Sequence, residues 1–220
     1  RVASHHQFGT AKWVIRSGNT FLLSPLFLKT NDFGELPSSI DLISARTEFY
    51  SFPTALPTVK QGSIKLDLQR RDFTINTMAI RLDGKHYGEL IDYWGGMDDL
   101  REKLIRVLHS LSFVDDPTRV LRAIRFEQRL DFHLEKRTEQ LLKEAIPLLE
   151  QVSGDRIRHE FDLILAGNHC ADIMQRLQDF SILKYIHPYF KWDGKNSQVL
   201  ELALNKPIEK NWGIPDNIGN

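Results

Sequence analysis

The sequence predicts an α+β fold in which a small mixed β-sheet comes first and an all-α part follows. Up to about residue 97, short apolar runs rich in β-branched and aromatic residues alternate with Gly, Pro and Asp turns, a pattern typical of strands. From Asp98 onward, apolar residues recur every three to four positions, which indicates helices. With 220 residues, 41% hydrophobic and 26% charged, the composition is that of a globular protein and excludes a disordered or fibrous one.

The strand pattern in the first part covers residues 12–15, 21–28, 40–43, 75–82 and 89–93. The last of these runs follows the turn Asp83-Gly84-Lys85, which favours a chain reversal. Residues 47–62 carry Pro53, Pro57 and Gly62 without a clean period. We therefore expect a long loop there, and loops of that length are often functional.

The helical pattern in the second part covers residues 116–130, 136–149, 153–167, 171–180 and 197–204. In the first of these helices one face is expected to carry Val120, Leu121, Ile124 and Gln128, and another face Arg122, Arg125 and Arg129. We expect three domains, at residues 1–97, 98–166 and 167–220. The tail from residue 206 is polar and contains Pro and Gly, so we expect it to be irregular.

The net charge, the cysteine content and the lengths of the apolar runs limit further what kind of protein this is. The 29 basic and 29 acidic residues cancel, which neither favours nor excludes nucleic acid as a partner. The single cysteine, Cys170, excludes a disulfide framework and a cysteine-rich zinc site, and it fits a reducing compartment such as the cytoplasm. No apolar run approaches the roughly 20 residues needed to cross a bilayer, so we expect no membrane association.

The densest polar cluster is QRRDFTIN at residues 69–76. Arg70 and Arg71 carry forked donors that suit phosphate oxygens. Asp72 and Asn76 are four residues apart, so on a helical turn they would share a face and could bind vicinal hydroxyls such as those of a ribose. In the alternative interpretation, Asp72 caps a short helix, Phe73 faces the core and the two arginines are solvated.

A second cluster, FVDDPTRVLRAIRF, spans residues 113–126. Pro117 suits the first position of a helix, which makes Asp116 a natural N-cap. Asp116 and Arg119 are three residues apart and so adjacent at the helix end, where they offer an acceptor beside donors. This combination matches the Watson–Crick edge of adenine or cytosine and not that of uracil or guanine, with about 1–3 kcal/mol of discrimination for a good bidentate contact.

Together, these clusters resemble the class II tRNA nucleotidyltransferase and poly(A) polymerase family, which adds CCA, CC, A or poly(A) to RNA without a nucleic-acid template. The resemblance is collinear. It rests on FGTAKW at 8–13, IDLISARTEFY at 40–50, the run ending in QRRDFTIN, LIDYWGGMDDL at 90–100, DDPTRVLRAIRF at 115–126 and VSGDRIRHEF at 152–161. It implies a partial nucleotidyltransferase head followed by a helical neck and the start of a helical body.

The resemblance also implies roles for individual residues, each carried over from the matching motif. Arg70 and Arg71 would hold the triphosphate, and Asp72 and Asn76 would serve the ribose. Asp116 and Arg119 would read the incoming base, with Asp115 standing where the family has Glu. The remaining implied residues are Arg122 at the nucleotide, Arg156 and Arg158 along the neck, and Asp98 at the hinge between head and neck. Solvated helix faces remain the alternative for Arg156 and Arg158, and helix initiation for Asp98.

The family uses divalent metal ions, normally Mg²⁺, held by carboxylates of a Gly-Gly-x-Val-Arg-Asp turn and an Asp-x-Asp pair. Neither motif stands at the expected place in this sequence. We expect them to lie before Arg1, so that the chain would be a piece of a longer enzyme and inactive alone. Asp41, on a predicted strand, is the candidate for a third catalytic, metal-binding carboxylate. It could equally be an edge-strand residue on the sheet surface.

The resemblance implies ATP and possibly CTP as substrates, and the 3′ end of tRNA or another RNA as partner. Within the family, a CCA- or A-adding tRNA enzyme and a poly(A) polymerase remain alternatives. A non-catalytic RNA- or nucleotide-binding module is the alternative from another class, because the metal-binding turn is missing.

Overall fold

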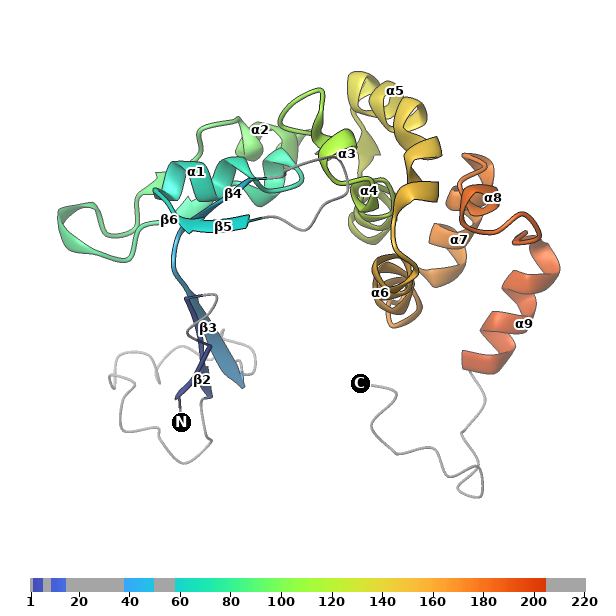
Figure 1. Cartoon of the computed structure of the whole chain (residues 1–220), viewed down its shortest axis with the longest axis horizontal. Coiled ribbons are helices and arrows are strands. Elements are labelled where there is room, and N and C mark those ends of the chain that lie inside the picture. The colour runs from blue at the N-terminus through green and yellow to red at the C-terminus, as the bar shows by residue number, and fades with distance from the viewer. Residues whose placement is uncertain (1, 6–8, 15–37, 50–57, 205–220) are drawn as a thin grey trace. The chain divides into compact units, whose positions relative to one another are not determined.

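The structure, a computed structural model, describes residues 2–5, 9–14, 38–49 and 58–204 (Figure 1). It divides into two compact units, one of residues 1–49 and 58–67 and the other of residues 50–57 and 68–220. Small sheets in the first part and helices in the second confirm the predicted α+β fold. The predicted strand at residues 21–28 and the predicted irregular tail from residue 206 lie outside the described residues.

The first unit contains a three-stranded antiparallel sheet in the order β1-β2-β3. Its strands are β1 (Val2–His5), β2 (Thr10–Val14) and β3 (Ser39–Ile43), so the strands predicted around residues 12–15 and 40–43 are confirmed. The register places Lys12 opposite Asp41 and Trp13 opposite Ile40. The turn between β1 and β2 contains Gly9 at φ +57°, a left-handed conformation that glycine adopts without strain.

The long loop predicted for residues 47–62 is wrong in part. β4 (Arg46–Phe49) pairs with β5 (Thr58–Gln61) in an antiparallel hairpin. Both strands lie outside the segment that carries Pro53 and Pro57 in the sequence. Residues 50–57, at the centre of the predicted loop, lie outside the described part.

The second unit begins within α1 (Ile64–Gln69). It continues with the 3₁₀ turn η4 (Thr74–Asn76), β6 (Ala79–Ile80), the 3₁₀ turn η5 (Gly84–His86) and β7 (Leu90–Ile91), which pairs antiparallel with β6. The strand predicted for residues 75–82 is therefore wrong over its first half. The Thr77 amide and hydroxyl both donate to the Thr74 carbonyl, and this local bonding favours a turn over a sheet ladder.

The neighbouring segments connect this part to the helices. They are α2 (Gly96–Arg101), β8 (Leu104–Ile105), α3 (Ser112–Asp115) and β9 (His133–Leu134), the last of which runs parallel to β8. Asp92 accepts hydrogen bonds from the backbone N–H groups of Trp94, Gly96 and Met97. Its carboxylate thus satisfies donors at the start of α2 that have no partner within the helix.

The helical part confirms the predicted helices, with shifted ends. It comprises α4 (Thr118–Leu130), α5 (Lys136–Ala145), the 3₁₀ segment η6 (Ile146–Gln151), α6 (Gly154–Leu165), α7 (Cys170–Asp179), α8 (Leu183–Ile186) and α9 (Gly194–Leu204). α4 packs against α6 and α7 (Figure 1). None of the helices in the described ranges is long and apolar enough to cross a membrane.

The core of the second unit surrounds α4. Val120, Leu121 and Ile124 are fully buried, as the pattern predicts, but the fourth inward residue is Glu127 and not Gln128. Arg176 of α7 makes two hydrogen bonds to the Glu127 carboxylate, at 2.9 and 3.0 Å. This paired charge explains how a glutamate occupies a core position. The domain boundaries expected after residues 97 and 166 stay a prediction, because the division into two compact units follows contacts between residues and does not test them.

Candidate functional site

The polar clusters that the sequence singles out meet within the second unit, at the N-terminal end of α4. Arg119 connects them: its Nη1 donates to the Ser112 hydroxyl at 2.6 Å, and its Nη2 donates to the Arg70 carbonyl at 2.9 Å. The Arg119 residue is only 4% exposed. A buried guanidinium with these partners fixes α3, α4 and the segment that follows α1 to one another.

Asp72 lies between two arginines of α4. One carboxylate oxygen is 3.3 Å from Arg119 Nε, and the other forms an ion pair with Arg122 Nη2. Burial raises the pKa of Asp72, and the charges of Arg122 and Arg119 oppose this effect. No side-chain bond caps η4, so the alternative in which Asp72 caps a short helix is wrong, as is the helical turn predicted for Asp72 with Asn76. Phe73 is fully buried, as that alternative predicts.

The row of charges continues along α4 to a glutamate on α6. Glu160, 6% exposed, lies 3.9 Å from Arg122 Nε and 3.6 Å from Arg125 Nη2 through its two carboxylate oxygens. Burial raises the pKa of Glu160 and lowers that of Arg125. We call the alternating series Arg119, Asp72, Arg122, Glu160, Arg125 the charge ladder. It joins the QRRDFTIN segment to α4 and α6.

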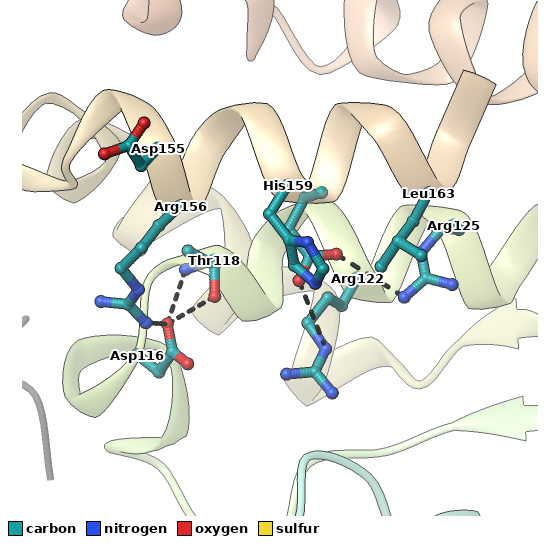
Figure 2. Close-up of a pocket in the computed structure, with 9 residues that line it drawn as sticks. Asp116, Thr118, Arg122, Arg125, Asp155, Arg156, His159 and Leu163 are labelled. Carbon is teal, nitrogen blue, oxygen red and sulfur yellow. Dashed lines mark hydrogen bonds and ion pairs between the residues drawn. The ribbon is translucent and has the colours of Figure 1, made fainter. Parts of the chain in front are cut away.

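The Asp116 carboxylate lies beside the first residue of α4, and its two oxygens differ in their contacts. Its Oδ1 accepts hydrogen bonds from the Thr118 amide at 3.0 Å, the Thr118 hydroxyl at 2.6 Å and Arg156 Nη2 at 2.6 Å. The bond from the Thr118 amide gives Asp116 a capping contact with the first residue of α4, although the N-cap position itself falls on Pro117 and not on Asp116. All three contacts fall on Oδ1, beside the Arg156 guanidinium, as Figure 2 shows. Among the residues that the structure describes, Oδ2 accepts no hydrogen bond.

The side chains of Asp116 and Arg119 do not contact one another, contrary to the adjacency predicted from their spacing. The Arg119 guanidinium turns toward Ser112, Arg70 and Asp72. Arg156 of α6 supplies the donor next to Asp116 instead. Sequence spacing describes neighbours on one helix, whereas this donor comes from a helix forty residues later.

A cleft of about 400 Å³ lies between the N-terminal half of α4 and α6 (Figure 2). It is lined by Asp116, Thr118, Arg122, Arg125, Asp155, Arg156, His159, Glu160 and Leu163. The cleft therefore presents guanidinium donors and carboxylate acceptors together. Such a surface suits a ligand that carries both kinds of group.

Other residues of the predicted site stand outside this cleft. Arg71 is exposed and donates to the Asn76 carbonyl at 3.3 Å. The Asp115 carboxylate lies 3.9 Å from His109. The side chain of Arg158 is 75% exposed, 3.7 Å from Asp155, which fits the solvated alternative.

Asp41 belongs to the first unit. Its side chain is 61% exposed and lies 3.7 Å from Lys12 on the neighbouring strand. Within the described ranges, no three His, Cys, Asp or Glu side chains gather where they could hold a metal ion. The role suggested for Asp41 stays a prediction.

The contacts of the two neighbouring aspartates Asp98 and Asp99 differ, and the hinge role suggested for Asp98 stays a prediction. Asp98 is exposed beside Arg101, whereas buried Asp99 accepts from the Thr74 hydroxyl at 2.6 Å and from Arg106 Nε at 3.0 Å. These bonds tie α2 to the turn that follows Asp72. The two aspartates are adjacent, and the motif alone does not distinguish the buried one from the exposed one.

Sequence reasoning also missed Glu160, although a signal for it exists. Glu160 falls between Ile157 and Ile164 at helical spacing, on the stripe of α6 that faces the core. A charged residue at a core position is rare unless it is paired. That position predicts a partner, but it does not tell which arginines provide it.

Comparisons with known proteins agree with this architecture. A family model described as the poly A polymerase head domain matches residues 27–106. Another, described as the probable RNA and SrmB-binding site of polymerase A, matches residues 131–193.

Among curated proteins, the chain is 45% identical over 203 residues to an A-adding tRNA nucleotidyltransferase of Geobacter sulfurreducens, covering 91% of this chain and 21% of that protein. It is 38% identical over 186 residues to an A-adding tRNA nucleotidyltransferase of Halalkalibacterium halodurans, covering 83% of this chain and 39% of that protein. The chain thus spans well under half the length of these relatives.

Solved structures show the same likeness. A CCA-adding enzyme in apo form II superposes with a TM-score of 0.78 at 38% identity, over 99% of this chain and 48% of that one. A tRNA nucleotidyltransferase complexed with a primer tRNA and an incoming ATP analog gives a TM-score of 0.70 at 37% identity, over 93% of this chain and 52% of that one.

Proposed function

Because the chain belongs to the poly(A) polymerase and tRNA nucleotidyltransferase family, we propose that the protein carrying it transfers a nucleotide from ATP or CTP to the 3′ end of tRNA. The relatives reported above are named A-adding, so we propose ATP as the main donor and CTP as the alternative. We place this activity in the cytoplasm, where the single buried Cys170 would stay reduced.

The observation that carries this proposal is the open carboxylate oxygen of Asp116 beside Arg156, at the edge of the cleft between α4 and α6. An acceptor next to a donor complements the amino group and ring nitrogen of adenine or cytosine. Uracil and guanine present the reverse order. A protein surface with this pair therefore supports selection of a base without a nucleic-acid template.

The other proposed contacts follow from the charge ladder. Arg70 and Arg71 would bind the triphosphate, and Asp72 with Asn76 would bind the ribose. The buried Asn76 Oδ1 has no hydrogen-bond partner in the described part of the chain, which supports a ligand contact near it. Arg119, which is buried, would hold Asp72 rather than touch the base.

Magnesium ions would activate the RNA 3′-hydroxyl and neutralise the leaving pyrophosphate when bound. The described residues of this chain do not fit such a site. Asp41 is exposed and paired with Lys12, and the described ranges offer no cluster of three suitable side chains.

The test is nucleotide addition by the complete protein to a tRNA that ends in CC, with labelled ATP, CTP, GTP or UTP. We expect one A to be added and no G or U. Long A tails on unrelated RNA would favour a poly(A) polymerase. Binding of ATP and tRNA without incorporation would favour a non-catalytic module, and either outcome would overturn the proposal.

A further inference from the structure

Glu160 occupies an unusual place for an acidic residue. It lies on the core-facing stripe of α6, it is 6% exposed, and its carboxylate faces Arg122 and Arg125 of α4. Removing a carboxylate from water is unfavourable unless partners compensate for it. The two guanidinium groups supply part of this compensation, so the three side chains form one electrostatic unit.

The geometry of this unit differs from that of a structural ion pair in the same helical bundle. Arg176 donates two hydrogen bonds to the Glu127 carboxylate, at 2.9 and 3.0 Å. Glu160 instead stands 3.9 and 3.6 Å from its arginines, and its Oε2 is buried without a hydrogen-bond partner in the described part of the chain. The Nε atoms of Arg122 and Arg125 share that condition. Loosely satisfied buried charges reduce stability, and their presence indicates a functional demand.

The contacts of Arg122 within the charge ladder indicate what this functional demand is. Arg122 is shared between Glu160 on one side and Asp72 on the other. Arg122 already forms a close ion pair with Asp72 through Nη2, while its Nε faces Glu160. If Glu160 lost its charge, only Asp72 would hold the guanidinium, so the Glu160 carboxylate restrains Arg122 in the orientation in which it meets Asp72.

We propose that Glu160 is a positioning residue for nucleotide binding: it sets the orientation of the Arg122 guanidinium that pairs with Asp72. This inference rests on the proposed function, in which Asp72 and Arg122 contact the nucleotide. It adds to that function a residue of α6 that acts through Arg122. Arg156 lies one helical turn earlier on α6 and holds Asp116, so one face of α6 would position two residues that contact the nucleotide.

The test compares Glu160→Gln with the matched variant Glu127→Gln. Both remove one buried negative charge, so any general increase in attraction for a triphosphate is the same in the two proteins. ATP affinity is measured by calorimetry on the full chain, with thermal unfolding measured separately. We expect Glu160→Gln to weaken ATP binding about tenfold, the effect of one charged hydrogen bond, and Glu127→Gln to reduce stability without changing ATP affinity.

A second pair of variants keeps the test decisive if Glu160→Gln does not fold. Glu160→Asp retains the charge but shortens a reach that is already 3.9 Å to Arg122. We expect its ATP affinity to fall several-fold, and that of Glu127→Asp to remain unchanged. Equal ATP affinity in the Glu160 and Glu127 variants would overturn the inference, as would failure of the unmodified chain to bind ATP. Nucleotide addition to tRNA by the complete wild-type protein reports separately on the proposed function.

Discussion

At the scale of single residues, Asp116 combines two roles in one carboxylate. Oδ1 caps α4 and binds Arg156, while Oδ2 remains available at the edge of the cleft. Capping contributes to stability whether or not a nucleotide is present. In the proposed function, base selection depends on the second oxygen, so the two roles can be separated by experiment.

We predict that Asp116→Ala in the complete protein has both effects. Loss of the cap should lower the free energy of unfolding by about 1 kcal/mol. Loss of the acceptor should reduce discrimination against GTP and UTP by about tenfold or more. Urea unfolding and competition between nucleotides measure the two effects independently.

The matched control is Glu135→Ala. Glu135 caps α5 by accepting from the Thr138 amide at 2.8 Å, so its loss should cost a similar free energy of unfolding. Its nucleotide choice should stay that of wild type. If Asp116→Ala shows the same unchanged choice, Asp116 is a helix cap and nothing more.

The sequence predicts contacts between neighbours in the chain, but not contacts between residues that are far apart in it. The capping contact of Asp116, with Thr118 two residues later, is local, and the sequence predicts it. Its partner Arg156 and the Glu160 contact to Arg122 come from a helix that is distant in the sequence. Spacing along one helix contains no information on such pairs. The prediction that Arg119 is the neighbour of Asp116 is therefore wrong.

At the scale of elements, α2 holds the turn of the QRRDFTIN segment in place. Asp99 binds Thr74 and Arg106, and Gly96 packs directly on the same turn. A Cβ at Gly96 would stand 2.4 Å from the Thr74 carbonyl oxygen. No side chain fits there without a shift of the backbone.

We predict that Gly96→Ala destabilises the chain by about 1–3 kcal/mol, the usual cost of overpacking. Gly154→Ala is the control: a Cβ at the start of α6 meets nothing within 4 Å. That substitution should be neutral or stabilise by about 0.4–1 kcal/mol, because it restricts the unfolded chain. Equal free energies of unfolding for the two variants in urea would contradict the close packing of α2 on Thr74.

The cap of α2 should respond to pH. Burial favours the protonated acid, but the backbone N–H groups of Met97, Gly96 and Trp94 outweigh it and lower the pKa of Asp92. A lowered pKa in the folded state means that the contribution is complete above the unfolded value of about 3.9 and is lost as the pH falls through the folded value.

We therefore predict that Asp92→Asn is less stable than wild type by about 1 kcal/mol at pH 7. The difference should diminish progressively below about pH 4. Denaturant unfolding between pH 7 and pH 2.5 measures it. Asp98→Asn, at an exposed neighbouring position, should match wild type throughout, and a pH-independent deficit in Asp92→Asn would exclude the charged cap.

At the scale of the whole molecule, the sequence predicts the long helices well because each has several turns of repeated apolar spacing. It misses the parallel pair β8–β9, in which each strand has two residues and the strands are separated by α3 and α4. A strand of two residues is too short to show an alternating pattern of apolar and polar residues. For the same reason the sequence draws attention to the two polar clusters, but does not show how the charge ladder joins them.

The central claim is that this chain selects adenine or cytosine through Asp116. The most direct measurement is calorimetric titration of the full chain with ATP, CTP, GTP and UTP, repeated with Asp116→Ala. The account predicts that ATP or CTP binds more tightly than GTP and UTP, and that the substitution removes this preference. Equal binding of all four nucleotides by the wild-type chain, or a preference that survives in Asp116→Ala, would contradict it.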